Sequence, residues 1–233
     1  MTAAPLPLLM EDVRFRYPGK SSFAMDIPRL KLSPRETVML LGSSGSGKST
    51  LLSLICGFVA AQSGRIEIGG TSLAGLRPGA RDRFRGEHIG VIFQQFNLLP
   101  YARVLDNILL PLQFAPARRQ RAGDPAAEAE RLCHRLRLPA DVLTTPAGRL
   151  STGQQQRVAV ARALIGQPPL IIADEPVSAL DAEAQDAFLA LLFEQVEQAG
   201  SSLLMVSHDP RLGGRFNRVL QLGDIAETRK DAA

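Results

Sequence analysis

The sequence predicts an α/β fold with a mainly parallel sheet, and two observations carry this prediction. Short apolar runs typical of strands buried on both faces occur at Thr37–Leu41, Ile89–Phe93, Leu170–Ala173 and Leu203–Val206. Segments with helical periodicity lie between or beside them, at Thr50–Phe58, Val104–Gln113, Ala126–Leu138, Gln154–Ile165 and Ala182–Ala199. Helices that alternate with buried strands indicate a layered α/β domain.

The first forty residues show the alternation of half-buried strands instead. Val13, Phe15 and Tyr17 alternate with arginines, and a second alternating run follows the turn at Pro18-Gly19. These runs predict an antiparallel β subdomain at the N-terminus.

Residues 97–150 carry helical patterns without a good buried strand, and they include the basic run Arg118-Arg119-Gln120-Arg121. We expect a helical subdomain inserted into one domain that covers residues 1–233. The final residues, Glu227 to Ala233, are expected to be a short frayed tail.

Composition excludes several classes of protein. With 45% hydrophobic and 21% charged residues, the 233-residue chain is typical of an ordinary globular protein. A net charge of +4 is too small to indicate nucleic-acid binding by itself, and two cysteines exclude a disulfide framework. There is no apolar run of about 18 residues and no signal-peptide pattern, so we expect a soluble, cytoplasmic protein.

Two basic runs have two possible explanations. The arginines at 77, 81, 83 and 85 and those at 118, 119 and 121 either face an anionic membrane surface or form a solvated face.

A phosphate-binding loop follows the first buried run. The pattern G-x-x-x-x-G-K-[ST] is matched in full by Gly42-Ser43-Ser44-Gly45-Ser46-Gly47-Lys48-Ser49, with Thr50 beginning the next helical stretch. Glycines allow backbone amides to approach an anion, and the helix N-terminus adds partial positive charge. Lys48, which is the one lysine between Lys31 and Lys230, supplies a flexible charge for the β- and γ-phosphates, and the Ser49 hydroxyl can ligate Mg²⁺.

The phosphate-binding loop alone fits kinases, GTPases, helicases and transporters, and a second, acidic motif narrows this choice. The strand Leu170–Ala173 ends in Asp174 and Glu175. Asp174 can hold Mg²⁺ through water, and Glu175 can accept a proton from the attacking water.

A third segment narrows the family. Leu150-Ser151-Thr152-Gly153-Gln154-Gln155-Gln156-Arg157 combines an N-cap serine, a glycine and a helix start, which together form a second anion site. Taken in isolation, the same pattern also fits an ordinary capped helix. The segment closely resembles the Leu-Ser-Gly-Gly-Gln signature of ABC-transporter ATPases. The resemblance implies a P-loop NTPase core in which Ser151, Thr152, Gly153 and Gln154 bind the γ-phosphate of an ATP held by the other subunit of a head-to-tail dimer.

The remaining family positions follow in order along the chain. The resemblance implies that Tyr17 stacks on adenine and that Gln94 senses Mg²⁺ and the γ-phosphate. It likewise implies that His208 contacts the γ-phosphate. The segment Ser178-Ala179-Leu180-Asp181 is similar to the loop that crosses the dimer interface, with Ser178 and Asp181 as its polar residues.

One residue departs from the family pattern. Thr152 stands where the family usually has glycine, and its branched side chain would strain the loop if the position needs positive φ. At an ordinary negative φ, threonine fits and its hydroxyl can donate to phosphate. We expect the second case, with Thr152→Gly changing turnover by less than about tenfold.

The segment from Phe93 to Ile108 and the run Leu52–Gly57 resemble ATPase subunits of the lipoprotein-releasing and macrolide-exporter group. That resemblance implies ATP-driven closure of two identical subunits beneath separately encoded membrane permease subunits, at the inner face of the cell membrane. A GTPase is excluded because the chain has no Asn-Lys pair. Two alternatives remain open: an ABC-type ATPase acting on nucleic acid, and an ATP-dependent dimer clamp with little hydrolysis.

Overall fold

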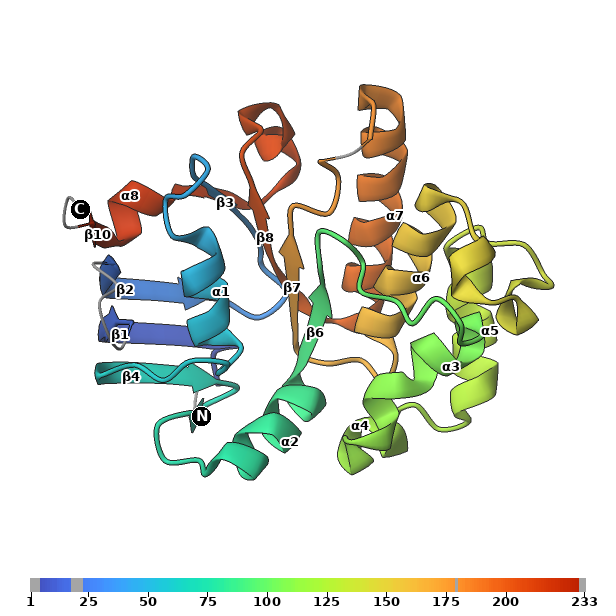
Figure 1. Ribbon diagram of the computed structural model, residues 1–233, viewed down its shortest axis with the longest axis horizontal. Helices are drawn as coiled ribbons and strands as arrows, with labels where there is room; N and C mark the ends of the chain where they lie inside the picture. The colour runs from blue at the N-terminus through green and yellow to red at the C-terminus, as the bar shows by residue number, and fades with distance from the viewer. Residues whose placement is uncertain (1–4, 18–22, 179, 231–233) are drawn as a thin grey trace. The chain divides into compact units, whose positions relative to one another are not determined.

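The computed structural model describes residues 5–17, 23–178 and 180–230, and the chain divides into two compact units. The first unit comprises Met1–Arg85 and Ser202–Ala233, and the second comprises Gly86–Ser201. The Pro18-Gly19 turn and Ala179 lie outside the described residues. Each unit has its own sheet strands and helices (Figure 1).

An antiparallel sheet in the first unit has the strand order β10-β2-β1-β4-β5. Its strands are β1 (Leu8–Arg16), β2 (Phe23–Leu32), β4 (Ser63–Ile68), β5 (Thr71–Ser72) and β10 (Glu227–Lys230). The β1–β4 register shifts between Glu11 and Arg14, and Asp12 there has a φ of 51°. This bulge changes the phase of the buried side chains, so that Leu8 and Met10 before it and Val13 and Phe15 after it all face the core.

The end of the chain differs from the expectation of a frayed tail. Residues Glu227–Lys230 form β10, which pairs antiparallel with β2 over Phe23–Asp26. The sequence Glu-Thr-Arg-Lys has no apolar alternation, so backbone pairing rather than side-chain burial stabilises this edge strand.

A parallel sheet in the same unit has β3 (Thr37–Leu41) between β8 (Ser202–Ser207) and β9 (Arg218–Gln221). Every residue of β8 is buried, as expected for a strand covered on both faces. The helices of this unit are α1 (Lys48–Ile55), most of α2 (Pro78–His88), the 3₁₀ helix Pro210–Arg215 and α8 (Leu222–Ile225). The α1 helix ends earlier than predicted because Gly57 adopts left-handed backbone, with a φ of 67°.

The second unit pairs β6 (Ile89–Ile92) in parallel with β7 (Leu170–Asp174). Its helices are α3 (Val104–Leu109), α4 (Pro116–Arg121), α5 (Pro125–Arg135), α6 (Thr152–Leu164) and α7 (Ala182–Ala199), with 3₁₀ turns at Leu110–Gln113, Val142–Thr144 and Ala147–Arg149. The predicted helix Val104–Gln113 tightens into 3₁₀ geometry where Pro111 lacks an amide donor. Helix α6 contacts α3, α5, α7 and β6, so it is the central helix of this unit (Figure 1).

The interpretation of the basic run at 118–121 as a membrane-facing or solvated surface is wrong for its first residue. Arg118 is 1% exposed, whereas Arg119 and Arg121 are exposed. The Arg118 guanidinium is buried because it donates to five backbone carbonyls, which replace the hydration that it loses.

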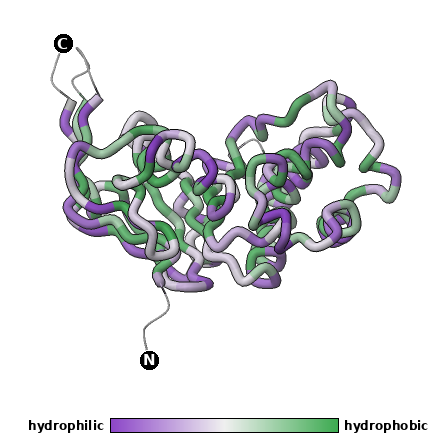
Figure 2. The backbone as a smooth tube through the Cα atoms, turned by 90° about the horizontal axis from the view of Figure 1, so that it is seen from below, coloured by the Kyte–Doolittle hydropathy of each residue, from purple (hydrophilic) through white to green (hydrophobic). Residues whose placement is uncertain are grey.

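Hydrophobic and hydrophilic residues alternate over short stretches along the chain (Figure 2). Among the described residues, no helix has the length and apolar character that a membrane crossing requires.

Candidate active site

The glycine-rich loop connects β3 to α1 in a conformation that depends on glycine. Gly45 and Gly47 have φ values of 74° and 109°. A Cβ atom at Gly47 would lie 2.6 Å from the Met25 side chain, and one at Gly42 would lie 2.7 Å from Ser46 Oγ. The loop therefore has the close-packed backbone that a phosphate cradle needs, at the N-terminus of a helix.

Lys48 is the first residue of α1, and its side chain lies over the loop. Its side chain is 8% exposed, and Nζ donates to the carbonyls of Gly42 at 2.7 Å and Ser43 at 3.0 Å. Ser46 Oγ is buried and has no hydrogen-bond partner within the described part of the chain. A bound phosphate would provide an acceptor for both groups.

Tyr17 is placed beside the start of α1. Its hydroxyl lies 3.3 Å from Thr50 Oγ1, and its ring meets Phe15 edge-to-face with 4.7 Å between centroids. The ring is half-buried, which leaves part of it available for a flat ligand such as adenine.

His208 follows the strand that pairs with the P-loop strand. Leu41 of β3 is in register with Ser207 of β8, so Gly42 and His208 leave neighbouring parallel strands at the same edge. His208 is exposed. The next residue, Asp209, caps the following 3₁₀ helix, and a hydrogen bond from Arg211 lowers the pKa of the Asp209 carboxyl to about 2.

The second unit brings the other predicted catalytic residues to one edge of its strand pair. Ile92 of β6 is in register with Ala173 of β7, so Asp174 ends β7 while Gln94 and Glu175 follow the ends of these adjacent strands. Gln94 is exposed in a turn, and the two carboxylates are half-buried. Glu175 has a φ of 44°, an unusual backbone conformation of the kind that recurs at functional sites.

The signature segment forms a capped helix start. Ser151 Oγ accepts from the Gln154 amide at 3.3 Å, while Gln154 Oε1 accepts from the Ser151 amide at 3.0 Å. Thr152 is the first residue of α6 and has no positive φ, so the threonine strains nothing. A Cβ at Gly153 would meet no atom within 4 Å in the described structure, so packing within the chain does not require glycine there.

The predicted interface loop continues from the acidic pair. Ser178 Oγ donates to the Glu175 carbonyl at 3.1 Å, and Asp181 caps α7 by accepting from the Ala184 amide at 2.9 Å. Both polar residues therefore have local structural contacts within the second unit.

Sequence reasoning missed two residues of α6 that bond to the loops of the second unit. Gln156 Nε2 donates to the carbonyl of Pro176, next to Glu175. Arg162 donates to the carbonyls of Phe96 and Asn97, two residues beyond Gln94. The sequence did offer a signal for them, because the polar residues Gln156 and Arg162 interrupt the otherwise apolar buried face of this helix.

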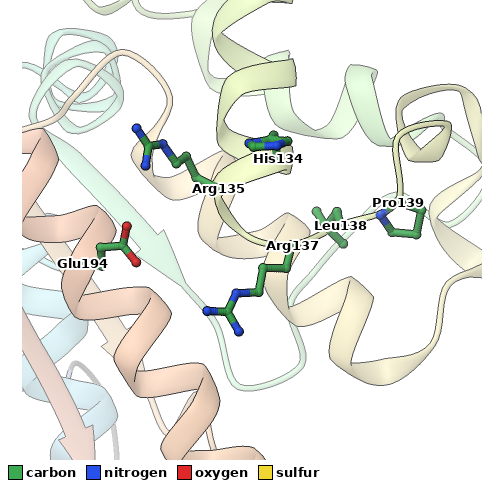
Figure 3. A pocket seen from close by; sticks show the side chains of 6 residues that line it. All are labelled: His134, Arg135, Arg137, Leu138, Pro139 and Glu194. Carbon is green, nitrogen blue, oxygen red and sulfur yellow. The ribbon is translucent and has the colours of Figure 1, made fainter.

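A hollow of about 640 Å³ in the second unit contains no predicted site residue. Figure 3 shows Glu194 of α7 across it from His134 and Arg135 of α5, with Arg137, Leu138 and Pro139 from the turn that follows.

The Mg²⁺ and ATP that the motifs imply fit the residues present. Ser49 in the first unit offers a hydroxyl oxygen, and Gln94 and Asp174 in the second unit offer amide and carboxylate oxygens; each is a kind of ligand that Mg²⁺ prefers. The unpartnered Ser46 hydroxyl and the Lys48 ammonium suit the phosphates.

Comparison with known proteins agrees with this arrangement. The ABC transporter family matches residues 25–178. The lipoprotein-releasing system ATP-binding protein LolD of Anaeromyxobacter dehalogenans is 44% identical over 195 residues, covering 84% of this chain and 80% of that protein. The macrolide export ATP-binding/permease protein MacB of Bradyrhizobium diazoefficiens is 39% identical over 88% of this chain and 31% of its own length.

Solved structures give the same result for the fold. The dimeric bacterial ABC transporter cassette MJ0796 superposes with a TM-score of 0.77 at 30% identity, covering 97% of this chain and 99% of that one. A second dimeric structure of MJ0796, in a post-hydrolysis state with ADP and Pi, gives a TM-score of 0.75 at 31% identity and the same coverage. The chain belongs to the ABC transporter family, and it is an ATP-binding, ATP-hydrolysing subunit of that family.

Proposed function

We propose that this chain binds and hydrolyses ATP through the residues of its nucleotide motifs. Tyr17 stacks on the adenine, and the loop Gly42–Gly47 with Lys48, Ser49 and Thr50 binds the phosphates. The intact loop, with Lys48 held over its carbonyls, is the observation that carries this assignment.

Hydrolysis is assigned to residues that follow strand ends. Glu175 accepts a proton from the attacking water, and His208 contacts the γ-phosphate. Ser49, Asp174 and Gln94 would hold Mg²⁺, which when bound neutralises charge on the phosphates. The strand registers support this. Leu41, just before Gly42, is in register with Ser207, just before His208. Ile92, two residues before Gln94, is in register with Ala173, just before Asp174.

The signature segment Ser151–Gln154 serves the ATP of a second copy in a head-to-tail homodimer, with Ser178 and Asp181 at the interface. The open space at Gly153 supports this assignment, since nothing within the chain needs the small residue. The dimeric state of MJ0796 supports it as well.

Two such subunits work with integral membrane permease subunits and lie at the inner face of the cell membrane. The names of the relatives support this: one belongs to a lipoprotein-releasing system, and another joins an ATP-binding part to a permease. Neither alternative gains support, because the comparisons point to transporters and because the conformation of Thr152 removes the steric argument for an inactive clamp.

The proposal is tested by separating ATP binding from hydrolysis. Glu175→Gln keeps the shape of the side chain and removes the base, so the variant should bind ATP and stay associated. With Mg²⁺ and ATP, its mass by light scattering should rise from the 25.2 kDa of one chain to twice that value, without phosphate release.

Adding Lys48→Ala to the same variant is the control and should restore the monomer. A Glu175→Gln variant that hydrolyses ATP at nearly the parent rate would refute the role of Glu175. One that stays monomeric with bound ATP would refute the dimer.

A further inference from the structure

Helix α6 is bonded to the turn that contains Gln94. Arg162, about 15 Å along the helix from Thr152, is 7% exposed. Its Nη1 donates to the Asn97 carbonyl at 2.6 Å, and its Nη2 donates to the Phe96 carbonyl. The two arms of one planar guanidinium thus hold two consecutive peptide groups.

Those two peptide groups belong to an unusual stretch of backbone. Phe96 and Asn97 have φ values of 59° and 50°, a left-handed conformation that L residues adopt only when their surroundings support it. Local hydrogen bonds from their amides reach the Phe93 carbonyl at 3.0 Å and the Gln95 carbonyl at 2.6 Å. The turn around Gln94 therefore depends on outside support, which Arg162 provides at Phe96 and Asn97 and the Asn107 side chain provides further on, at Leu99.

The bonds of Arg162 explain why a charge is buried at this position. Within the described residues, no carboxylate forms an ion pair with it, and its guanidinium donates instead to carbonyl oxygens of this turn. Burial lowers the pKa of the guanidinium, which measures the cost of placing the charge there. The two hydrogen bonds that the planar guanidinium donates to the carbonyls of Phe96 and Asn97 offset this cost of desolvation.

The helix end that carries Arg162 is itself fixed. The guanidinium of Arg118 donates to the carbonyls of Arg162 at 3.2 Å, Ala163 at 2.6 Å and Ile165 at 2.7 Å. It also donates to the Ile89 carbonyl at 3.3 Å, at the start of β6. The start of β6 and the end of α6 are thus held together, and Arg162 ties the exit of the turn after β6 to the same helix.

We propose that Arg162 is a positioning residue that sets the orientation of Gln94 for metal-bound ATP. The inference rests on the proposed role of Gln94 in holding Mg²⁺. Since α6 begins at Thr152 in the signature segment, one helix carries the site for the partner's phosphate and fixes the turn that serves the chain's own nucleotide.

Two measurements test the proposal, one on the turn and one on the metal. Arg162→Met should accelerate amide hydrogen exchange across residues 93–99 by about tenfold or more, most of all before Leu99, since the turn loses the support of Arg162 while Asn107 still holds Leu99. It should also weaken Mn²⁺ binding to the ATP-loaded protein, followed by electron paramagnetic resonance, by roughly three- to tenfold. Binding of ATP in the presence of a metal chelator should stay at the parent value.

Three variants make the result specific. Arg162→Lys keeps the charge with a single donor group, so its exchange rate and Mn²⁺ affinity should fall between those of the parent and Arg162→Met. Arg121→Met is the matched control: it removes bonds to the Gly166 carbonyl at 3.0 Å and the Glu87 carbonyl at 2.7 Å, near the same helix end, without touching the turn. Gln94→Ala reports the full effect of losing the amide.

Each contrary outcome has one meaning. If amide exchange across residues 93–99 is no faster in Arg162→Met than in Arg121→Met, Arg162 does not anchor the turn. If Arg162→Met does not fold, Arg162→Lys is compared with Arg121→Met in the same way. Unchanged Mn²⁺ affinity in Arg162→Met, with weakened affinity in Gln94→Ala, would overturn the positioning role alone. Unchanged affinity in Gln94→Ala would refute the proposed metal role of Gln94 and this inference with it.

Discussion

Replacing Arg118 with methionine removes the centre of the polar network in the second unit. The guanidinium donates to the carbonyls of Gly86, Ile89, Arg162, Ala163 and Ile165, at 2.6 to 3.3 Å. Burial lowers the pKa of the Arg118 side chain to about 9, so it is charged at pH 7 and its cost of burial is already present in the parent.

The loss in free energy of unfolding that Arg118→Met causes follows from two opposing effects. Each hydrogen bond to a charged group is worth about 1.5–3 kcal/mol, so five bonds would suggest roughly 8–15 kcal/mol if nothing opposed them. Removing the charge also removes its desolvation cost, and methionine refills most of the volume. What remains is a set of buried carbonyls without their donor; an unsatisfied buried group costs about 1–3 kcal/mol, so we expect a net loss of about 3–5 kcal/mol in free energy of unfolding.

Urea denaturation followed by circular dichroism measures this value. A loss of about 3–5 kcal/mol corresponds to a fall in melting temperature of roughly 10 °C for a chain of this size. Arg119→Met is the control, because the neighbouring side chain is exposed and its loss should cost under about 0.5 kcal/mol. A loss below 1 kcal/mol for Arg118→Met, or equal losses for the two variants, would refute the reasoning.

Two further predictions concern the nucleotide. Lys48→Ala should weaken Mg-ATP binding, measured by calorimetry, by about 100-fold or more, because a charge-assisted contact to phosphate worth about 3 kcal/mol is lost; near-parent affinity would contradict the role of Lys48. Thr152→Gly should change the turnover of the assembled transporter by less than about tenfold, since Thr152 already has helical backbone without positive φ; a hundredfold rise in phosphate release would show that the threonine acts as a brake.

The buried strands were predictable because their signal is local. The strands β3, β7 and β8 are short apolar runs, and each was predicted to within one residue at either end. Strands β4 and β10 were missed because half or more of their residues are polar and their stability comes from pairing with distant strands.

Arg118 shows the limit of reading charge from sequence. A run of arginines ordinarily indicates a solvated face, and nothing adjacent to Arg118 signals burial. Its acceptors are spread from Gly86 to Ile165, so only the folded chain brings them together. The same holds for Arg162, whose acceptors at Phe96 and Asn97 lie more than sixty residues away.

The candidate site was predictable as a set of motifs but not as a set of conformations. Residue spacing predicted the loop at Gly42–Ser49, and the buried strand before it predicted the acidic pair at Asp174, since phosphate and metal binding require fixed residue types. Whether Thr152 needs positive φ depends on where α6 begins, and the Ser151 capping box places that start at Thr152, two residues before the predicted Gln154.

The central claim, that each active site joins two copies of the chain, is tested most directly by mixing two inactive variants. Lys48→Ala disables the P-loop, and Gly153→Asp places a negative charge where the partner's γ-phosphate should bind. The aspartate should not disturb folding, since a Cβ at Gly153 meets nothing within 4 Å and an acidic residue suits the first turn of a helix.

Each variant alone should release almost no phosphate. In an equal mixture, half of the dimers are mixed and each has one intact site, so phosphate release should recover to as much as roughly a quarter of the parent rate. A mixture as inactive as its components, with dimers present, would show that a single copy holds the whole site and would contradict the account.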